Sequence, residues 1–193
     1  MRIIAGQAKG KRIEAPEGLL VRPTTDRARE AIFNTLYSLG GVESLTVADL
    51  FAGSGALGLE ALSRGASQAV FIENSPAVLK VLRSNIAKLG YQSRSEVIAR
   101  DVMNERRFTQ TSFDVVFCDP PYSFDRWQEL LDNINSRILV VESDRKIELN
   151  SHWKCLKIRK YATTIITIAE SSTRPPKKAL QTNPQKAPNR QKT

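Results

Sequence analysis

A chain of 193 residues, 41% of them hydrophobic, is long enough to bury a core, and its length is typical of one domain. It has no apolar run near the ~18 residues that a membrane span requires and no signal-peptide pattern, so we expect a cytoplasmic protein with no membrane partner. One histidine and two cysteines give no metal or disulfide pattern, and Cys118 and Cys155 are both expected in the core. The net charge of +9 indicates a polyanionic partner.

The two ends of the chain are the most basic parts. Residues 1–24 open with "MRIIAGQAKGKRIEAP", which predicts a small basic β-hairpin, and a helix is expected from Thr25 to Tyr37. Residues 171–193 are rich in Pro, Lys, Gln and Asn and contain no acidic residue, so we expect a disordered tail that either aids solubility or contacts nucleic acid. Residues 25–170 between them are expected to form the main domain.

Strand and helix patterns alternate through that domain. Apolar runs at 46–52, 69–73, 96–99, 113–118 and 138–142 predict buried strands, with helices between them. Ser75 and Pro76 favour a helix start, Gly90 a helix end, and Ser123 is expected to cap a later helix. Two strand patterns in 153–170 have no helix between them. The sequence therefore predicts an α/β fold, with a mostly parallel seven-stranded sheet, helices on both faces and an antiparallel hairpin at the edge.

A glycine-rich turn follows the first strand. In "DLFAGSGALG", Gly53, Gly55 and Gly58 have the G-x-G-x-x-G spacing that lets a ligand approach backbone amides, although a purely structural turn would also fit. A phosphate-binding P-loop is excluded, because Leu59 and Glu60 occupy the positions of its Lys and Ser or Thr.

Three carboxylates are expected beside this turn. Asp49, Glu73 and Asp101 lie at or after the ends of successive strands, at one edge of the sheet. They would repel the pyrophosphate of NAD but suit S-adenosylmethionine, which carries a sulfonium and an ammonium group. An NAD-dependent oxidoreductase remains an alternative function. Capping of a helix remains an alternative role for each of these carboxylates. The candidate cofactor site comprises Asp49, Phe51, Ala52, Gly53, Ser54, Gly55, Gly58, Glu73, Asn74, Asp101 and Val102.

The "DPPY" stretch follows the fourth strand, where a second ligand would meet the first. Asp119 and the Pro120 carbonyl could accept hydrogen bonds from an exocyclic amine of a base, and Pro121 stiffens the loop. Tyr122 offers a face for stacking a splayed-out base. Asp119, Pro120, Pro121 and Tyr122 are therefore the candidate catalytic residues, although a strand end with a covering aromatic is the structural alternative.

Taken in order, "RIIAGQAKGKRIEAP", "RPTTDRAREAIFN", "DLFAGSGALGLEALSRGA", "FIE" and "DPPY" resemble the bacterial 16S rRNA guanine-N2 methyltransferases of the RsmD type. The resemblance covers residues 2 to about 170. It implies a Rossmann-like class I methyltransferase fold and S-adenosylmethionine as donor. The implied acceptor is a guanine amine of 16S rRNA, presented on an assembled or partly assembled 30S particle. We also expect a monomer that holds no metal. The tail departs from the family pattern, as does Ala162, where the family often has glycine.

The resemblance also implies that "RPTTDRARE" docks the substrate or the cofactor. Together with the basic N-terminal segment it could grip RNA phosphates, although a solvated helix end is the alternative. Methylation of adenine or cytosine in DNA and a non-catalytic RNA-binding role also remain open. The candidate RNA contacts are Arg2, Lys9, Lys11, Arg12, Arg22, Thr24, Thr25, Arg27 and Arg29.

Overall fold

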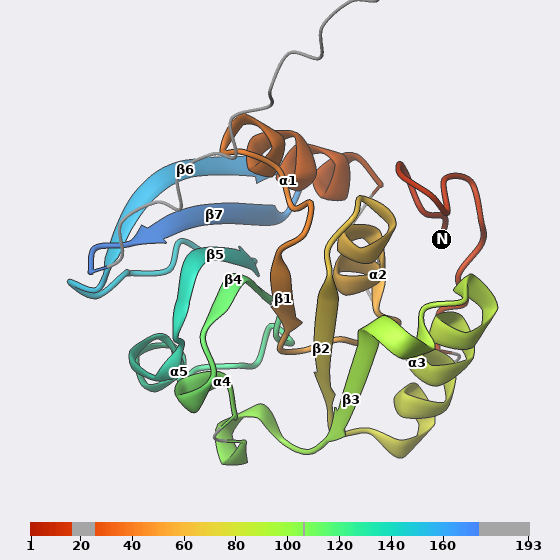
Figure 1. Cartoon of the computed structure of the whole chain (residues 1–193). Coiled ribbons are helices and arrows are strands. Elements are labelled where there is room, and N and C mark those ends of the chain that lie inside the picture. Colours follow the sequence, from red (N-terminus) through yellow and green to blue (C-terminus); the bar gives the residue numbers. More distant parts are fainter. Residues whose placement is uncertain (17–25, 106, 174–193) are drawn as a thin grey trace, which may run out of the picture.

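A single seven-stranded sheet runs through the computed structural model, which describes residues 1–16, 26–105 and 107–173 (Figure 1). The strand order is β3-β2-β1-β4-β5-β7-β6. The first five strands pair in parallel, and β7 runs antiparallel to both β5 and β6. The predicted sheet with its antiparallel hairpin is confirmed. The strands are β1 (Thr46–Asp49), β2 (Gln68–Glu73), β3 (Ser95–Ala99), β4 (Phe113–Cys118), β5 (Ser136–Ser143), β6 (Trp153–Tyr161) and β7 (Thr164–Ser171).

Helices cover both faces of this sheet, as Figure 1 shows. One hydrophobic cluster joins α1, α2 and α3 to one face, and a second joins α4 and α5 to the other. No helix in the described part of the chain is long and apolar enough to cross a membrane. The helices are α1 (Asp26–Ser38), α2 (Ala56–Ser63), α3 (Pro76–Leu89), η1 (Gln92–Arg94), η2 (Val102–Asn104), α4 (Arg107–Gln110) and α5 (Trp127–Asn133).

The central strand β4 shows how the sequence produces this layering. All six of its residues are buried, as expected for a parallel strand covered on both faces. Successive side chains alternate between the faces, so Phe117 packs with Phe33 of α1 while Cys118 lies in the cluster with Leu130 of α5. Each large apolar side chain buried in this way contributes about 1.5–3 kcal/mol.

Most helix boundaries follow the local sequence signals. Pro76 opens α3 after Ser75, and Gly90 ends it in the left-handed conformation with φ 77°. The expected cap at Ser123 is wrong. Helix α5 begins at Trp127, because the chain after the double proline first makes a turn in which the Phe124 amide donates to the Pro121 carbonyl at 2.8 Å.

The N-terminal segment, residues 1–16, packs against α2. Its hairpin is reduced to one antiparallel bridge between Arg2 and Arg12, and Ile3 and Ile13 are buried in the cluster shared with the helices. Gly6 has φ +81°, and a Cβ there would lie 1.8 Å from the Ser63 carbonyl oxygen of α2. Only glycine therefore allows this close approach.

The β6–β7 hairpin forms the end of the sheet opposite β3 and turns at Ala162. That residue has φ 52°, a left-handed conformation that glycine adopts more easily than alanine. Cys118 is buried as expected, but Cys155 is exposed, because β6 is the edge strand. The predicted RNA contacts Arg22, Thr24 and Thr25 lie outside the described residues, as do residues 174–193 of the tail.

Candidate active site

The glycine turn connects β1 to α2 and is shaped by two residues in the left-handed region. Gly53 has φ 55° and Gly55 has φ 85°, a conformation that costs other residues conformational energy. Gly58 serves a different purpose, since a Cβ there would lie 2.3 Å from Cε1 of Phe71 on β2. Gly58 thus lets α2 lie close against the sheet, and the turn presents its amides at the carboxyl end of β1.

Glu73, at the end of β2, closes this turn with its carboxylate. Its Oε2 accepts a hydrogen bond from the Gly53 amide at 3.1 Å, and its Oε1 accepts from the amides of Asn74 and Ser75 at 2.9 and 2.8 Å. A carboxylate has about four acceptor sites, so such a group can also accept from a ligand. The three backbone hydrogen bonds hold the Glu73 carboxylate rigidly beside the glycine turn.

Asp49 is the buried carboxylate of the site, with 2% of its surface exposed. Its Oδ2 accepts from the Gly58 amide at 3.0 Å, which fixes the start of α2 against β1. Burial raises the pKa of Asp49 to about 7, and the negative charge of Glu73 adds to this rise, while the Gly58 hydrogen bond opposes it. A positively charged ligand group beside Asp49 would favour its ionised form.

Asp101 follows β3 and caps the short helix η2. Its Oδ1 accepts from the Met103 amide at 2.8 Å, while the adjoining Val102 is buried. The capping interpretation of Asp101 is therefore correct, and it does not prevent the second carboxylate oxygen from meeting a ligand.

The loop of residues 119–126 brings the DPPY stretch to the same edge. Asp119 is half-buried and Pro120 buried, whereas Tyr122 is 43% exposed. The ring of Phe124 meets Phe51 of the glycine turn edge-on, with the centroids 5.4 Å apart. This aromatic contact ties the loop after β4 to the turn after β1.

A single cavity of about 720 Å³ joins the two halves of the site. It is lined by thirteen of the fifteen predicted catalytic and cofactor residues, and the two exceptions, Gly55 and Gly58, shape the turn from behind. Its acidic and catalytic-loop members are Asp49, Glu73, Asp101, Asp119, Pro120, Pro121 and Tyr122, and its other predicted members are Phe51, Ala52, Gly53, Ser54, Asn74 and Val102.

Sequence reasoning missed Glu142, a buried carboxylate that also lines this cavity. It follows Val141 of β5, which pairs with Cys118 of β4, so Glu142 and Asp119 occupy neighbouring strand ends. The signal that identified Asp49 and Glu73, a carboxylate at the end of a strand, was also present at Glu142.

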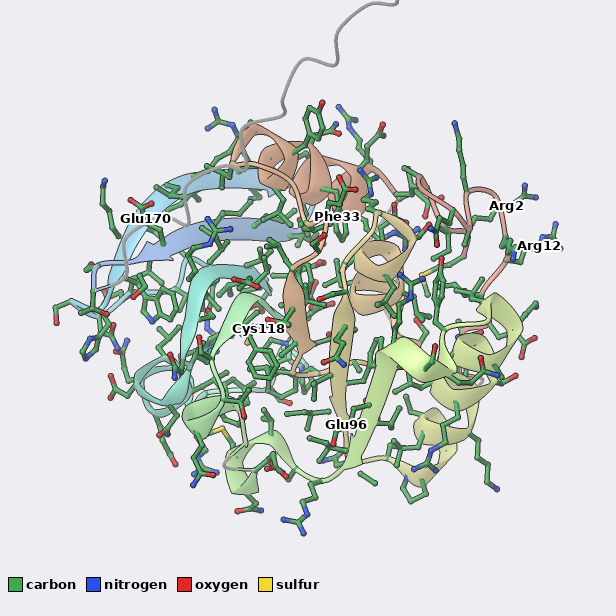
Figure 2. All side chains as sticks on the ribbon, viewed as in Figure 1. Arg2, Arg12, Phe33, Glu96, Cys118 and Glu170 are labelled. Atoms are coloured by element: carbon green, nitrogen blue, oxygen red, sulfur yellow. The ribbon has the colours of Figure 1, made fainter. Side chains whose placement is uncertain are left out.

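The structure describes six of the basic residues predicted to contact RNA, and they divide into five exposed side chains and the buried Arg29. Arg2, Lys9, Lys11, Arg12 and Arg27 are exposed, and Figure 2 shows Arg2 and Arg12 together at the surface beside α3.

Arg29 contradicts its assignment as an RNA contact, because its side chain is fully buried. Its Nη2 lies 2.9 Å from Oδ1 of Asp26, and its Nε lies 3.9 Å from Oε2 of Glu60. Glu60 also accepts from the amides of Ile4 and Ala5 at 2.7 and 3.0 Å. Burial lowers the pKa of Arg29, and the charge of Glu60 opposes that shift. Arg29 Nη2 also donates to the Arg2 carbonyl oxygen, so Arg29 and Glu60 together hold the N-terminal segment against α2.

No group of three or more His, Cys, Asp and Glu side chains is arranged to hold a metal ion within the described ranges. The cavity is instead rich in carboxylates that already accept backbone hydrogen bonds. Such a set of hydrogen-bond acceptors suits a ligand that donates from hydroxyl, amine and ammonium groups.

Comparisons with known proteins agree with this geometry. Residues 1–170 match the family model described as Conserved hypothetical protein 95. A Haemophilus influenzae relative named Ribosomal RNA small subunit methyltransferase D is 34% identical over 169 residues, which cover 81% of this chain and 86% of the relative. The protein of the same name from Escherichia coli K12 is 42% identical over 122 residues, covering 63% and 60%. A solved Escherichia coli structure, yhhF, provisionally described as a methyltransferase, matches with a TM-score of 0.78 at 33% identity, covering 89% of this chain and 97% of that chain.

Proposed function

Because the chain belongs to the Conserved hypothetical protein 95 family of RsmD-type methyltransferases, we propose that it methylates the exocyclic N2 amine of a guanine in 16S rRNA. The methyl donor is S-adenosylmethionine. The observation that carries the proposal is that one cavity contains both the strand-end carboxylates and the DPPY loop. A cationic donor and an amine acceptor would therefore meet within it.

The residues of the donor side fit S-adenosylmethionine, which supplies an electrophilic methyl group on its sulfonium. Asp49 would attract the methionine ammonium, and the Glu73 carboxylate would accept hydrogen bonds from the two ribose hydroxyls. Asp101 would accept from the adenine amine, with the Val102 amide beside a ring nitrogen. None of these groups suits a pyrophosphate, which disfavours a dinucleotide.

The acceptor side positions a base through the DPPY loop. The side chain of Asp119 and the carbonyl of Pro120 would accept the two N–H groups of an exocyclic amine and aim its nitrogen at the methyl group. Asp119 would also receive the proton that the amine loses. Tyr122, exposed at the mouth, would stack on the flipped base.

The exposed cations outside the cavity would bind the RNA backbone. Arg2, Lys9, Lys11, Arg12 and Arg27 remain predicted contacts, and phosphates favour such side chains without reading sequence. A cytoplasmic monomer acting on a 30S particle or an assembly intermediate completes the proposal.

The assay is transfer of labelled methyl from S-adenosylmethionine to 30S subunits, naked 16S rRNA and duplex DNA, followed by mapping of the modified base. We expect label at N2 of one guanine in 16S rRNA. Label in DNA alone, at adenine N6 or cytosine N4, would reject the ribosomal assignment. Calorimetry with S-adenosylhomocysteine against NAD distinguishes the oxidoreductase alternative.

Asp119→Ala tests the catalytic loop directly. We expect the rate of methyl transfer to fall by about 10²–10³-fold or more, while the affinity for S-adenosylhomocysteine stays within about twofold. Asp125→Ala removes a similar charge from an exposed position of the same loop and should leave the rate unchanged. Full turnover by the Asp119 variant would contradict the proposed role.

A further inference from the structure

The loop of residues 119–126, called the acceptor loop below, contains two residues that cannot donate a backbone hydrogen bond. Pro120 and Pro121 have no amide hydrogens, so neither can donate to a neighbouring strand or loop. The turn from the Phe124 amide to the Pro121 carbonyl stabilises the loop only locally. Contacts from outside the loop therefore add to the forces that hold Tyr122 at the mouth of the cavity.

Arg145 supplies such contacts from the loop that follows β5. Its Nη1 donates to the Tyr122 carbonyl at 3.2 Å, and its Nη2 donates to the Phe124 carbonyl at 2.7 Å. Strands β4 and β5 are neighbours in the sheet, so the loops at their carboxyl ends lie side by side. One guanidinium thus spans two carbonyls of the acceptor loop.

Arg145 is itself held in place by the two residues before it. The Ser143 hydroxyl donates to the Arg145 carbonyl at 2.6 Å, and Oδ1 of Asp144 lies 3.1 Å from Nη1. Its planar fork presents N–H groups in fixed directions, a geometry that an ammonium group cannot reproduce. Contacts on both its backbone and its side chain therefore fix the direction in which Arg145 donates.

We propose that Arg145 is a positioning residue for methyl transfer. By binding their carbonyl oxygens, it fixes the positions of Tyr122 and Phe124 at the cavity. This role rests on the proposed function of the same site. The Phe124 ring in turn meets Phe51 of the glycine turn. Arg145 therefore sets the distance between the half of the site that holds the base and the half that holds the donor.

The competing role for an exposed arginine at this edge is contact with an RNA phosphate. Loss of such a contact weakens RNA binding and reduces its salt dependence, but it leaves the rate at saturating substrate unchanged. Loss of positioning lowers that rate, since a misplacement of about 1 Å can cost 10²-fold. Loss of positioning should therefore lower kcat, whereas loss of a phosphate contact should raise KM and leave kcat unchanged.

The experiment compares Arg145→Ala and Arg145→Lys with Lys146→Ala, which removes the same charge from the next, exposed position of that loop. Steady-state kinetics on the RNA substrate would give kcat and KM, and hydrogen exchange with mass spectrometry would follow a peptide that covers residues 119–127. For Arg145→Ala we expect kcat to fall by about 10- to 100-fold and exchange to rise, with affinity for S-adenosylhomocysteine unchanged. Arg145→Lys should recover part of the rate, and Lys146→Ala should retain both properties.

The proposal is overturned if Arg145→Ala keeps kcat within about twofold of the wild type, or if its loop exchanges as slowly as the wild type. Equal rises in KM for the alanine variants of Arg145 and Lys146, without loss of kcat, would assign both to phosphate contact. A wild-type protein that methylates no RNA would instead defeat the proposed function, whatever the exchange data show.

Discussion

Replacing Asp49 by asparagine tests both the electrostatics of the cavity and its proposed ligand. The wild-type carboxyl group has a pKa of about 7 in the folded protein, against an ordinary value of 3.8. Between these two pH values the folded state binds more protons than the unfolded state, so the free energy of unfolding decreases as pH rises through this window. The contribution of the Asp49 carboxyl to the free energy of unfolding is fully present below pH 3.8 and is lost above pH 7.

The size of this effect follows from the two pKa values. Between pH 5 and pH 8, the Asp49 carboxyl should lower the free energy of unfolding by roughly 2–3 kcal/mol. The side chain of the Asp49→Asn variant cannot ionise, yet its oxygen can still accept from the Gly58 amide. Urea unfolding of both proteins at pH 5 and pH 8 would isolate the Asp49 contribution, because the other carboxylates are common to the two proteins.

The same carboxyl links cofactor binding to pH. If the ionised form attracts the methionine ammonium, the affinity for S-adenosylhomocysteine should rise by about eightfold from pH 6 to pH 7.5, and the asparagine variant should bind more weakly with little pH dependence. Calorimetry in buffers of different ionisation enthalpy would detect the released proton. A wild type and a variant with the same pH dependence, in both unfolding and binding, would refute a carboxyl that titrates near neutrality.

Three other substitutions test backbone geometry at two positions and the charge of the proposed RNA surface. Gly58→Ala places a methyl group against the Phe71 ring and should cost about 1–3 kcal/mol in urea unfolding, and an unchanged midpoint would mean that α2 can move away freely. Ala162→Gly should stabilise the protein by up to about 1 kcal/mol, because φ 52° suits glycine, and a lower midpoint would contradict that reasoning. Substituting both Arg12 and Arg27 by glutamine should weaken RNA binding and lower the slope of log K against log salt by about one for each phosphate contact, and an unchanged slope would count against this RNA surface.

The donor side of the site could be predicted because it depends on topology more than on detail. Once alternating strands and helices indicate a parallel sheet, the ends of all five parallel strands must meet at one edge. Asp49, Glu73, Asp101 and Asp119 each end or follow such a strand, and all four line the cavity. Their spacing in the chain was therefore sufficient to bring them together.

Side chains whose partners are distant in the sequence could not be placed in the same way. Arg29 resembles the exposed Arg27 in sequence, and only the packing of α1 against α2 brings it to Glu60, 31 positions later in the chain. Arg145 lies in a polar stretch with no recognisable motif, and its contacts depend on the course of a loop 21 to 23 positions earlier. Periodicity indicates which face a residue occupies, but not which group faces it across an interface.

The distribution of charge limits how RNA can enter the site. The whole chain carries +9, yet the cavity is lined by five carboxylates and two arginines, Arg100 and Arg126. Arg126 is already paired with Glu129 at 2.6 Å, so the interior remains unfavourable to phosphate. Under the proposed function, a cationic donor would be attracted to this interior, whereas an RNA backbone would remain on the basic surface outside it. Only an uncharged base would then pass inward, and this would require the target nucleotide to be splayed out of its stack.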